Sequence, residues 1–181
     1  MSALRLINET SITSNVNGIS ITDVFSSDFD IYKVTFNDLT NDTGNANVVL
    51  RFINSSGSIV NASNYDWALM DMGGGIAFGA YQGTNSASLG NTDAWVVTTS
   101  TTPNSSSATM YVFNPYSSSS YSFALLQSSG LILTNQSRTR KAIGVLKQTA
   151  SMTGFHIYQS TSSVNLTTGT IRTYGLRVDN G

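Results

Sequence analysis

Residues 30–37 read Asp-Ile-Tyr-Lys-Val-Thr-Phe-Asn, and this stretch indicates the fold class. Tyr32, Val34 and Phe36 fall on one side of an extended chain, and more polar side chains fall on the other. A period of two is the repeat of a β-strand with one buried face. We therefore predict a half-buried strand here that turns Tyr32, Val34 and Phe36 toward the core.

Similar short runs recur along the chain. Residues 48–53 form a second apolar run, and the turn-forming residues 41–45 lie between it and the first, so the two are predicted to form a hairpin with a longer loop. Glycine, proline and asparagine separate many of the later runs. The remaining predicted strands are 19–24, 94–98, 108–114, 121–127, 131–134, 140–147, 154–158 and 170–178.

About ten short strands at this spacing indicate a single-domain antiparallel β-sandwich, jelly-roll-like, over residues 1–181. One segment is predicted differently. Residues 64–72 lack β-branched side chains, follow a Ser63 or Asn64 that can cap a helix, and end at three glycines, 73–75. The predicted fold is therefore all-β with at most one short helix.

The composition narrows the class of protein. Charged residues make up 10% of the chain, against about 25% in an average soluble domain. The polar share comes instead from 28 Ser, 22 Thr and 17 Asn residues, which is typical of extracellular and virion β proteins. Cysteine is absent, so disulfides and thiolate metal sites are excluded. No apolar stretch has the length of a signal-peptide core or a membrane span, so we expect folding in the cytoplasm and no membrane insertion.

The charges are unevenly spread along the sequence. Residues 1–100 hold three basic and nine acidic side chains, whereas residues 101–181 hold six basic and one acidic. Two interpretations stay open: the two halves mix within the fold, or acidic and basic faces meet between neighbouring subunits. The net charge of −1 argues against nucleic acid as a partner.

Few residues suggest catalysis. His156 is the single histidine, and Phe155 and Ile157 on either side of it belong to the opposite strand face, so a catalytic role is not expected. Asp66 and Asp71 are the best candidates for a glycosidase-like carboxylate pair, but aspartates more often serve turns and caps. We predict no enzyme activity, no metal and no cofactor.

Two groups of residues are candidates for binding. Arg138, Arg140 and Lys141 form the single basic cluster, which is interpreted either as a solvated strand edge or as a charged contact to another subunit. Aromatic residues in loops are able to stack on sugar rings, although tryptophan is often a core anchor. Trp95, Tyr116 and Tyr81 are the candidates for contact with a glycan or a partner.

The C-terminal region carries a resemblance. Residues 153–158 read Thr-Gly-Phe-His-Ile-Tyr, and residues 169–177 read Gly-Thr-Ile-Arg-Thr-Tyr-Gly-Leu-Arg after a polar turn. This pattern, together with residues 19–24, 30–37 and 65–68, resembles the closing hairpin and the first strands of virion proteins from tailed phages of the marine and cyanobacterial type. The resemblance implies a jelly-roll-like sandwich in a capsid or tail position, with no catalytic motif.

The sequence thus predicts a non-enzymatic virion structural protein that binds other virion proteins and forms a homo-oligomer. A tail or fibre position leads a capsid-decorating one slightly, because the serine- and threonine-rich segments 98–107 and 117–120 are predicted to be exposed loops. The alternative is a carbohydrate-binding module that contacts a host-surface glycan.

Overall fold

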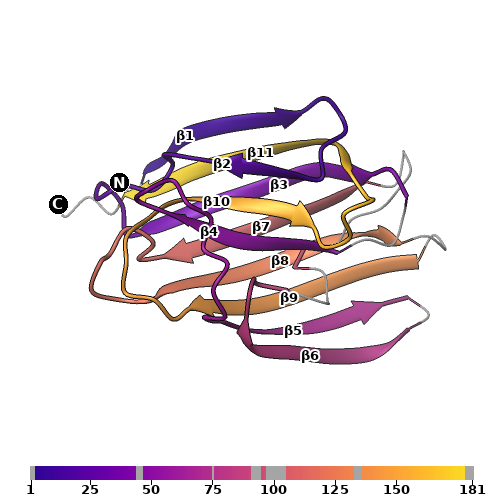
Figure 1. Cartoon of the computed structure of the whole chain (residues 1–181). Coiled ribbons are helices and arrows are strands. Elements are labelled where there is room, and N and C mark those ends of the chain that lie inside the picture. The colour runs from indigo at the N-terminus through magenta and orange to yellow at the C-terminus, as the bar shows by residue number, and fades with distance from the viewer. Residues whose placement is uncertain are drawn as a thin grey trace.

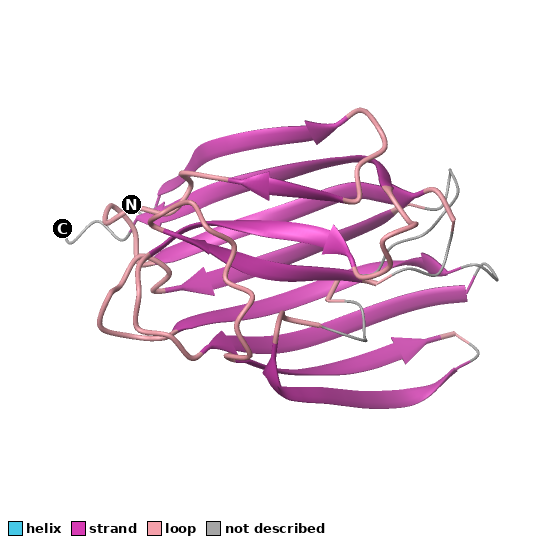
Figure 2. Ribbon diagram, viewed as in Figure 1, coloured by secondary structure: helices cyan, strands magenta, loops and turns pink. Residues whose placement is uncertain are grey.

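The computed structural model describes residues 3–43, 47–74, 76–90, 95–96, 105–132 and 136–177. These residues form eleven strands and no helix (Figure 2). The strands make two antiparallel sheets that pack face to face (Figure 1). The predicted β-sandwich is confirmed.

The larger sheet has eight strands in the order β1-β11-β3-β7-β8-β9-β5-β6, and the smaller has three in the order β2-β10-β4. The smaller sheet covers one face of the larger one. Its strands are β2 (Gly18–Ile21), β4 (Val48–Asn54) and β10 (Met152–Gln159). The larger sheet consists of β1 (Ala3–Ile12), β3 (Ile31–Asn41), β5 (Tyr65–Gly73), β6 (Ile76–Ser86), β7 (Ser106–Phe113), β8 (Ser122–Ile132), β9 (Gln136–Leu146) and β11 (Leu166–Arg177).

Both predicted hairpins are wrong. β3 pairs with β11 and β7, whereas β4 pairs with β10 in the other sheet. The C-terminal pair is likewise divided, since β10 lies in the small sheet and β11 in the large one. In each case the segment that joins the two strands crosses from one sheet to the other. The strands bond instead to partners that are not their immediate neighbours in the chain.

The predicted helix at residues 64–72 is also wrong. Tyr65, Trp67, Leu69 and Asp71 are buried and alternate with more exposed residues, which is the period of a strand. β5 lies between β6 and β9 and pairs with both. Pairing with β6 and β9 therefore outweighs the weak helical preference of residues 64–72.

Two other predicted strands change in extent. The strands predicted at 121–127 and 131–134 belong to one strand, β8, which runs through Gly130 to Ile132; residues 133–134 lie outside the described residues. Of the predicted strand 94–98, only Trp95 and Val96 are described, and Val96 bridges to Val48. Most of the predicted loop 98–107 also lies outside the described residues, and Ser106 and Ser107 belong to β7.

Aromatic rings fill the space between the sheets. Phe25 packs edge-on against Tyr32 of the large sheet, with ring centroids 4.8 Å apart, and it also contacts Phe52 and Phe155 of the small sheet. Tyr32, Val34 and Phe36 are fully buried, as predicted. Rings from both sheets thus form one continuous hydrophobic core.

A close approach over β9 extends this core beyond the small sheet. A Cβ atom at Gly144 would lie 2.5 Å from Leu89 Cδ2 and 3.0 Å from Trp95 Cη2. Only glycine leaves room for both side chains there. Leu89 and Val96 bridge to β4, so this segment continues the cover of the small sheet across β9.

Replacing Tyr65 by phenylalanine tests the placement of β5. The Tyr65 hydroxyl accepts a hydrogen bond from the Phe52 backbone N–H at 2.9 Å and donates one to the Val60 carbonyl at 3.0 Å. We expect Tyr65→Phe to lower the free energy of unfolding by about 1–3 kcal/mol, because both backbone groups lose a buried partner. Chemical denaturation measures this loss. The control, Tyr121→Phe on an exposed side chain, should change stability by less than about 0.5 kcal/mol; equal effects would contradict the assignment.

Candidate functional site

The large sheet has an outer face that the small sheet does not cover. Strand registers align its side chains in rows that run across β8, β9 and β5. Leu125 pairs with Ile143, and Ile143 pairs with Ala68. One row further along, Phe123 pairs with Val145, and Val145 pairs with Asp66. Because side chains in register share a face, apolar groups from strands distant in sequence gather here.

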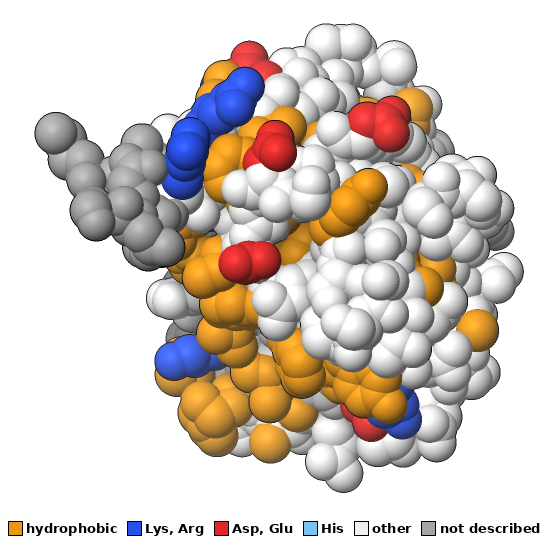
Figure 3. All heavy atoms as spheres, turned by 90° about the vertical axis from the view of Figure 1, so that its left-hand side faces the viewer, with side chains coloured by type: hydrophobic (Ala, Val, Ile, Leu, Met, Phe, Trp, Pro, Cys, Tyr) orange, Lys and Arg blue, Asp and Glu red, His pale blue; other side chains and the backbone are white. Residues whose placement is uncertain are grey.

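Large apolar side chains stand exposed on this face. Seven of them are between 39% and 62% exposed, and they come from five neighbouring strands. In Figure 3, hydrophobic side chains gather in the lower part of the view, at the level of β5, β6, β8 and β9 in Figure 1. We call these seven residues the outer apolar face: Met70 and Met72 on β5, Phe78 on β6, Tyr111 on β7, Phe123 and Leu125 on β8, and Ile143 on β9.

On the outer apolar face a group of three large side chains, which we call the ridge, lies beside a hollow over small side chains. Phe123, Leu125 and Ile143 stand on β8 and β9, whereas the small residues Ala68 and Ala80 occupy β5 and β6. A hollow of about 580 Å³ lies over these alanines, with Ile143 at its side. A second hollow of about 600 Å³ continues it toward Phe123 and Leu125. Contiguous exposed apolar surface of this kind marks a site of interaction in soluble proteins.

Sequence reasoning missed this face, although the signal was present. β9 contains the run Ala142-Ile143-Gly144-Val145-Leu146, and β8 contains Phe123-Ala124-Leu125-Leu126. Such runs are apolar at consecutive positions, so both faces of the strand are apolar. One face of such a strand packs in the core. The apolar side chains on the other face then need a second surface that covers them.

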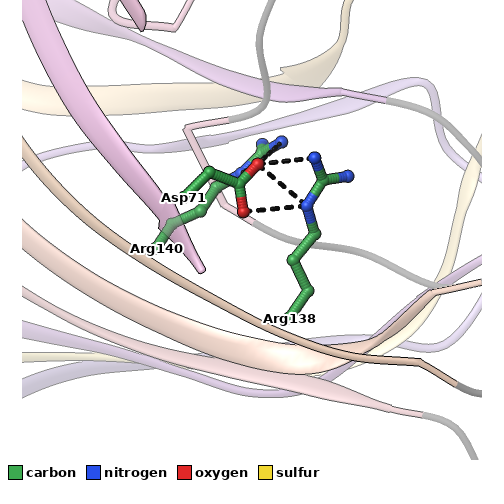
Figure 4. Close-up of polar contacts among 3 residues, drawn as sticks. All are labelled: Asp71, Arg138 and Arg140. Atoms are coloured by element: carbon green, nitrogen blue, oxygen red, sulfur yellow. Dashed lines mark hydrogen bonds and ion pairs between the residues drawn. The ribbon is translucent and has the colours of Figure 1, made fainter. Parts of the chain in front are cut away.

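A charged cluster lies on the inner face of the same sheet (Figure 4). The Asp71 carboxylate accepts hydrogen bonds from Arg138 Nε at 2.9 Å to both oxygens, and from Arg140 Nη2 at 3.1 Å. The side chain of Asp71 is 1% exposed and that of Arg140 is 5% exposed. Burial raises the pKa of the Asp71 carboxyl, but the bonds and charges of Arg138 and Arg140 outweigh burial and hold the pKa below its usual range.

The interpretation of Arg138 and Arg140 as residues of a strand edge is wrong, because β9 lies between β8 and β5. Both arginines form ion pairs with Asp71 of the same chain. Lys141 is exposed on the outer face, in register with Met70. A charge contact of Arg138, Arg140 or Lys141 with another subunit stays a prediction.

The acidic and basic halves of the sequence meet inside the chain. Each ion pair found among the described residues joins an acid from residues 1–100 to a base from residues 101–181. Lys147 Nζ lies 2.9 Å from Asp66 Oδ1, and Arg172 Nε lies 2.6 Å from Glu9 Oε2. The described part of the fold therefore mixes the two halves, as the first interpretation expects.

The candidate carboxylate pair is not assembled. Asp66 pairs with Val145 on the outer face, whereas Asp71 is buried on the inner face with Arg140. An odd spacing along a strand places two side chains on opposite faces of a sheet. The two carboxylates therefore cannot act on one substrate.

The three candidate aromatic residues are not brought together either. Trp95 is fully buried in the core, so it is unable to stack on a ligand. Tyr81 on β6 is exposed beside the hollow over the alanines. Tyr116 is exposed in the segment between β7 and β8, and it does not line that hollow. Stacking of a sugar on Tyr81 or Tyr116 remains a prediction.

His156 lies on the outer face of the small sheet, as predicted, while Phe155 and Ile157 point into the core. Its Nδ1 atom lies 2.9 Å from Ser20 Oγ, and its ring stacks on Tyr158. Burial lowers the pKa of His156, and the positive charge of Arg51 lowers it further. A lowered pKa makes this histidine a weaker base toward Ser20.

The part of the chain that the structure describes holds no group of three or more His, Cys, Asp or Glu side chains arranged around a common metal position. The same residues contain no helix able to cross a membrane.

Comparison with protein-family models finds no match, and comparison with curated proteins finds none either. The class of the chain is therefore defined by its fold, an all-β sandwich with two unequal antiparallel sheets.

Removing the charge of Asp71 tests the buried cluster. We expect Asp71→Asn to lower the free energy of unfolding by about 3–5 kcal/mol, because two guanidinium groups lose their shared buried counter-charge. Denaturant titration at fixed protein concentration measures the change. The matched control is Glu9→Gln, which breaks an ion pair with 35% and 47% exposed side chains and should cost less than about 1 kcal/mol. If Asp71→Asn lowered the free energy of unfolding by as little as Glu9→Gln does, the cluster would contribute little to stability.

The lowered pKa of His156 predicts a pH dependence. The unfolded chain takes up the proton near the ordinary value of 6.5, before the folded chain does, so protonation favours unfolding. Neutral His156 stabilises the folded chain above pH 6.5. This contribution is lost as the pH falls from 6.5 to the lower pKa that His156 has in the folded chain. We expect the free energy of unfolding to fall as the pH drops below 6.5, and to fall less steeply in His156→Gln. Parallel pH profiles for the two proteins would contradict this assignment.

Proposed function

We propose that the chain is a non-enzymatic structural subunit of a tailed-phage particle, tail- or fibre-associated or capsid-decorating, and that it acts through contacts between subunits. The observation that carries this proposal is the outer apolar face. Seven large apolar side chains on one sheet face are a strong reason for a second protein surface to cover them. A structural subunit supplies such a surface in the assembled particle.

The edge of the large sheet supports the same conclusion. β6 is an edge strand of eleven residues, Ile-Ala-Phe-Gly-Ala-Tyr-Gln-Gly-Thr-Asn-Ser, and it contains no charged residue and no proline. The opposite edge strand, β1, carries the charged residues Arg5 and Glu9. Proteins that stay monomeric commonly protect long edges with charges or bulges. β6 has no such charge, which suits a subunit that meets neighbours on this side.

The assignment to a phage particle draws on the sequence resemblance. Its C-terminal residues lie in one strand of each sheet. Residues 153–158 lie in β10, the middle strand of the small sheet, and residues 170–177 lie in β11, between β1 and β3. The matching pattern therefore coincides with strands that organise the sandwich.

Quantitative mass spectrometry of purified particles tests the proposal. We expect the chain in the particles at a fixed copy number, on the order of hundreds for a capsid position, or on the order of tens in multiples of three or six for a tail position. A non-structural protein of the same phage, measured in the same preparation, is the control for contamination. Absence of the chain from the particles, or an amount no higher than the control, would contradict the proposal.

A further inference from the structure

We propose that the outer apolar face binds the same face of a second copy of this chain, in a two-fold dimer in which the ridge on β8 and β9 of each copy enters the hollow over β5 and β6 of the other. The inference rests on the proposed structural role and names the partner of that surface.

The shape of the face is complementary to itself. Ile143 is 55% exposed and stands directly beside Ala68, its register partner on the next strand. A two-fold axis along the strands, between β9 and β5, places β9 of each copy over β5 of the other. Ile143 then lies over Ala68 of the second copy, and the reverse contact follows by symmetry. Contacts made twice by the same pair of residues are the mark of an isologous interface.

The charges on the face allow this packing. In the row that contains Leu125, Ile143 and Ala68, the fourth side chain is Gln82, so the row is uncharged across β8, β9, β5 and β6. The charged residues Asp66 and Lys141 lie in the rows on either side of it. The centre of the proposed interface is therefore uncharged, and charged residues are depleted at the core of stable interfaces.

The area is sufficient for a stable dimer. At roughly 80 Å² of exposed surface for each large side chain, the six residues of the outer apolar face on β5, β6, β8 and β9, which the second copy overlies, supply roughly 480 Å² per copy. A standard interface buries about 800 Å² per partner, of which somewhat more than half is apolar. The exposed apolar side chains alone thus reach the apolar share of such an interface.

Sedimentation equilibrium of the full chain over a range of concentrations tests the dimer. We expect dimers with a Kd on the order of 1 µM or lower. Ile143→Glu should weaken association about thirtyfold or more, because a charge would enter the apolar centre. The matched control is Leu6→Glu on β1, where the leucine is 50% exposed but lies on the opposite edge strand; its Kd should equal that of the wild type.

A second variant separates shape from general hydrophobicity. Ala68→Leu adds apolar surface but fills the hollow, so the proposed fit predicts weaker association. An apolar face that associates without a defined fit would associate more strongly after this change. A tighter dimer for Ala68→Leu would therefore overturn the proposal, and circular dichroism of each variant checks that the fold is kept.

Cysteine pairing tests the orientation. The chain contains no cysteine, so Ile143→Cys and Ala68→Cys variants each carry a single thiol. A disulfide requires Cβ atoms about 3.5–4.5 Å apart. On mild oxidation, a mixture of the two variants should form covalent dimers faster than either variant alone, and equal rates would overturn the orientation.

The outcomes for the two proposals are separable. A chain that is present in particles but monomeric at all concentrations would overturn the dimer and leave the structural role standing, with a different virion protein as the partner. A chain that dimerises as described but is absent from particles would overturn the structural role.

Discussion

An eight-stranded sheet has two faces, and the described part of this chain places three further strands against one of them. The small sheet, with the segment that carries Leu89 and Trp95, covers the inner face and completes the hydrophobic core. The outer face keeps apolar side chains on β5, β6, β7, β8 and β9, and no second layer covers them among the residues that the structure describes. Sheets are stable when their apolar faces are buried. This imbalance between the two sheets is therefore the basis of our proposal that another protein surface covers the outer face.

The charged side chains are arranged differently on the covered inner face and on the outer face of the large sheet. Asp71, Arg138 and Arg140 form a satisfied cluster on the inner face, and Asp66 and Lys147 pair at one side of the outer apolar rows. Ion pairs among the described residues are made within the chain, between its acidic first part and its basic second part. With 10% charged residues in the chain, the association that we propose relies mainly on apolar contact.

The sequence was most informative where its period was clear. The alternation at residues 30–37 correctly predicts β3 and the burial of Tyr32, Val34 and Phe36, and the alternation around His156 correctly predicts which side chains of β10 point inward. It could not show which strands pair. β3 and β4 are close in sequence but belong to different sheets, because strand pairing depends on contacts between residues far apart in the chain. Residues 64–72 were assigned wrongly for the same reason, since β6 and β9 enforce the strand there.

The candidate site illustrates the same limit. Arg138, Arg140 and Lys141 are adjacent in sequence, yet alternation directs the two arginines inward to Asp71 and the lysine outward. Trp95 was a candidate for ligand contact, but packing over Gly144 makes it a core residue. The outer apolar face is assembled from five strands by register, so no single segment reveals it. The consecutive apolar residues in β8 and β9 are the part of this face that the sequence alone shows.

The central claim is that the outer apolar face is covered in the assembled state, and methionine oxidation measures this directly. Met70 and Met72 are 43% and 42% exposed, whereas Met110 and Met152 are fully buried and serve as internal references. Limited peroxide treatment followed by mass spectrometry should oxidise Met70 and Met72 readily in the dilute isolated chain and at least about tenfold more slowly in purified particles. Equal oxidation rates in the two states would contradict the account.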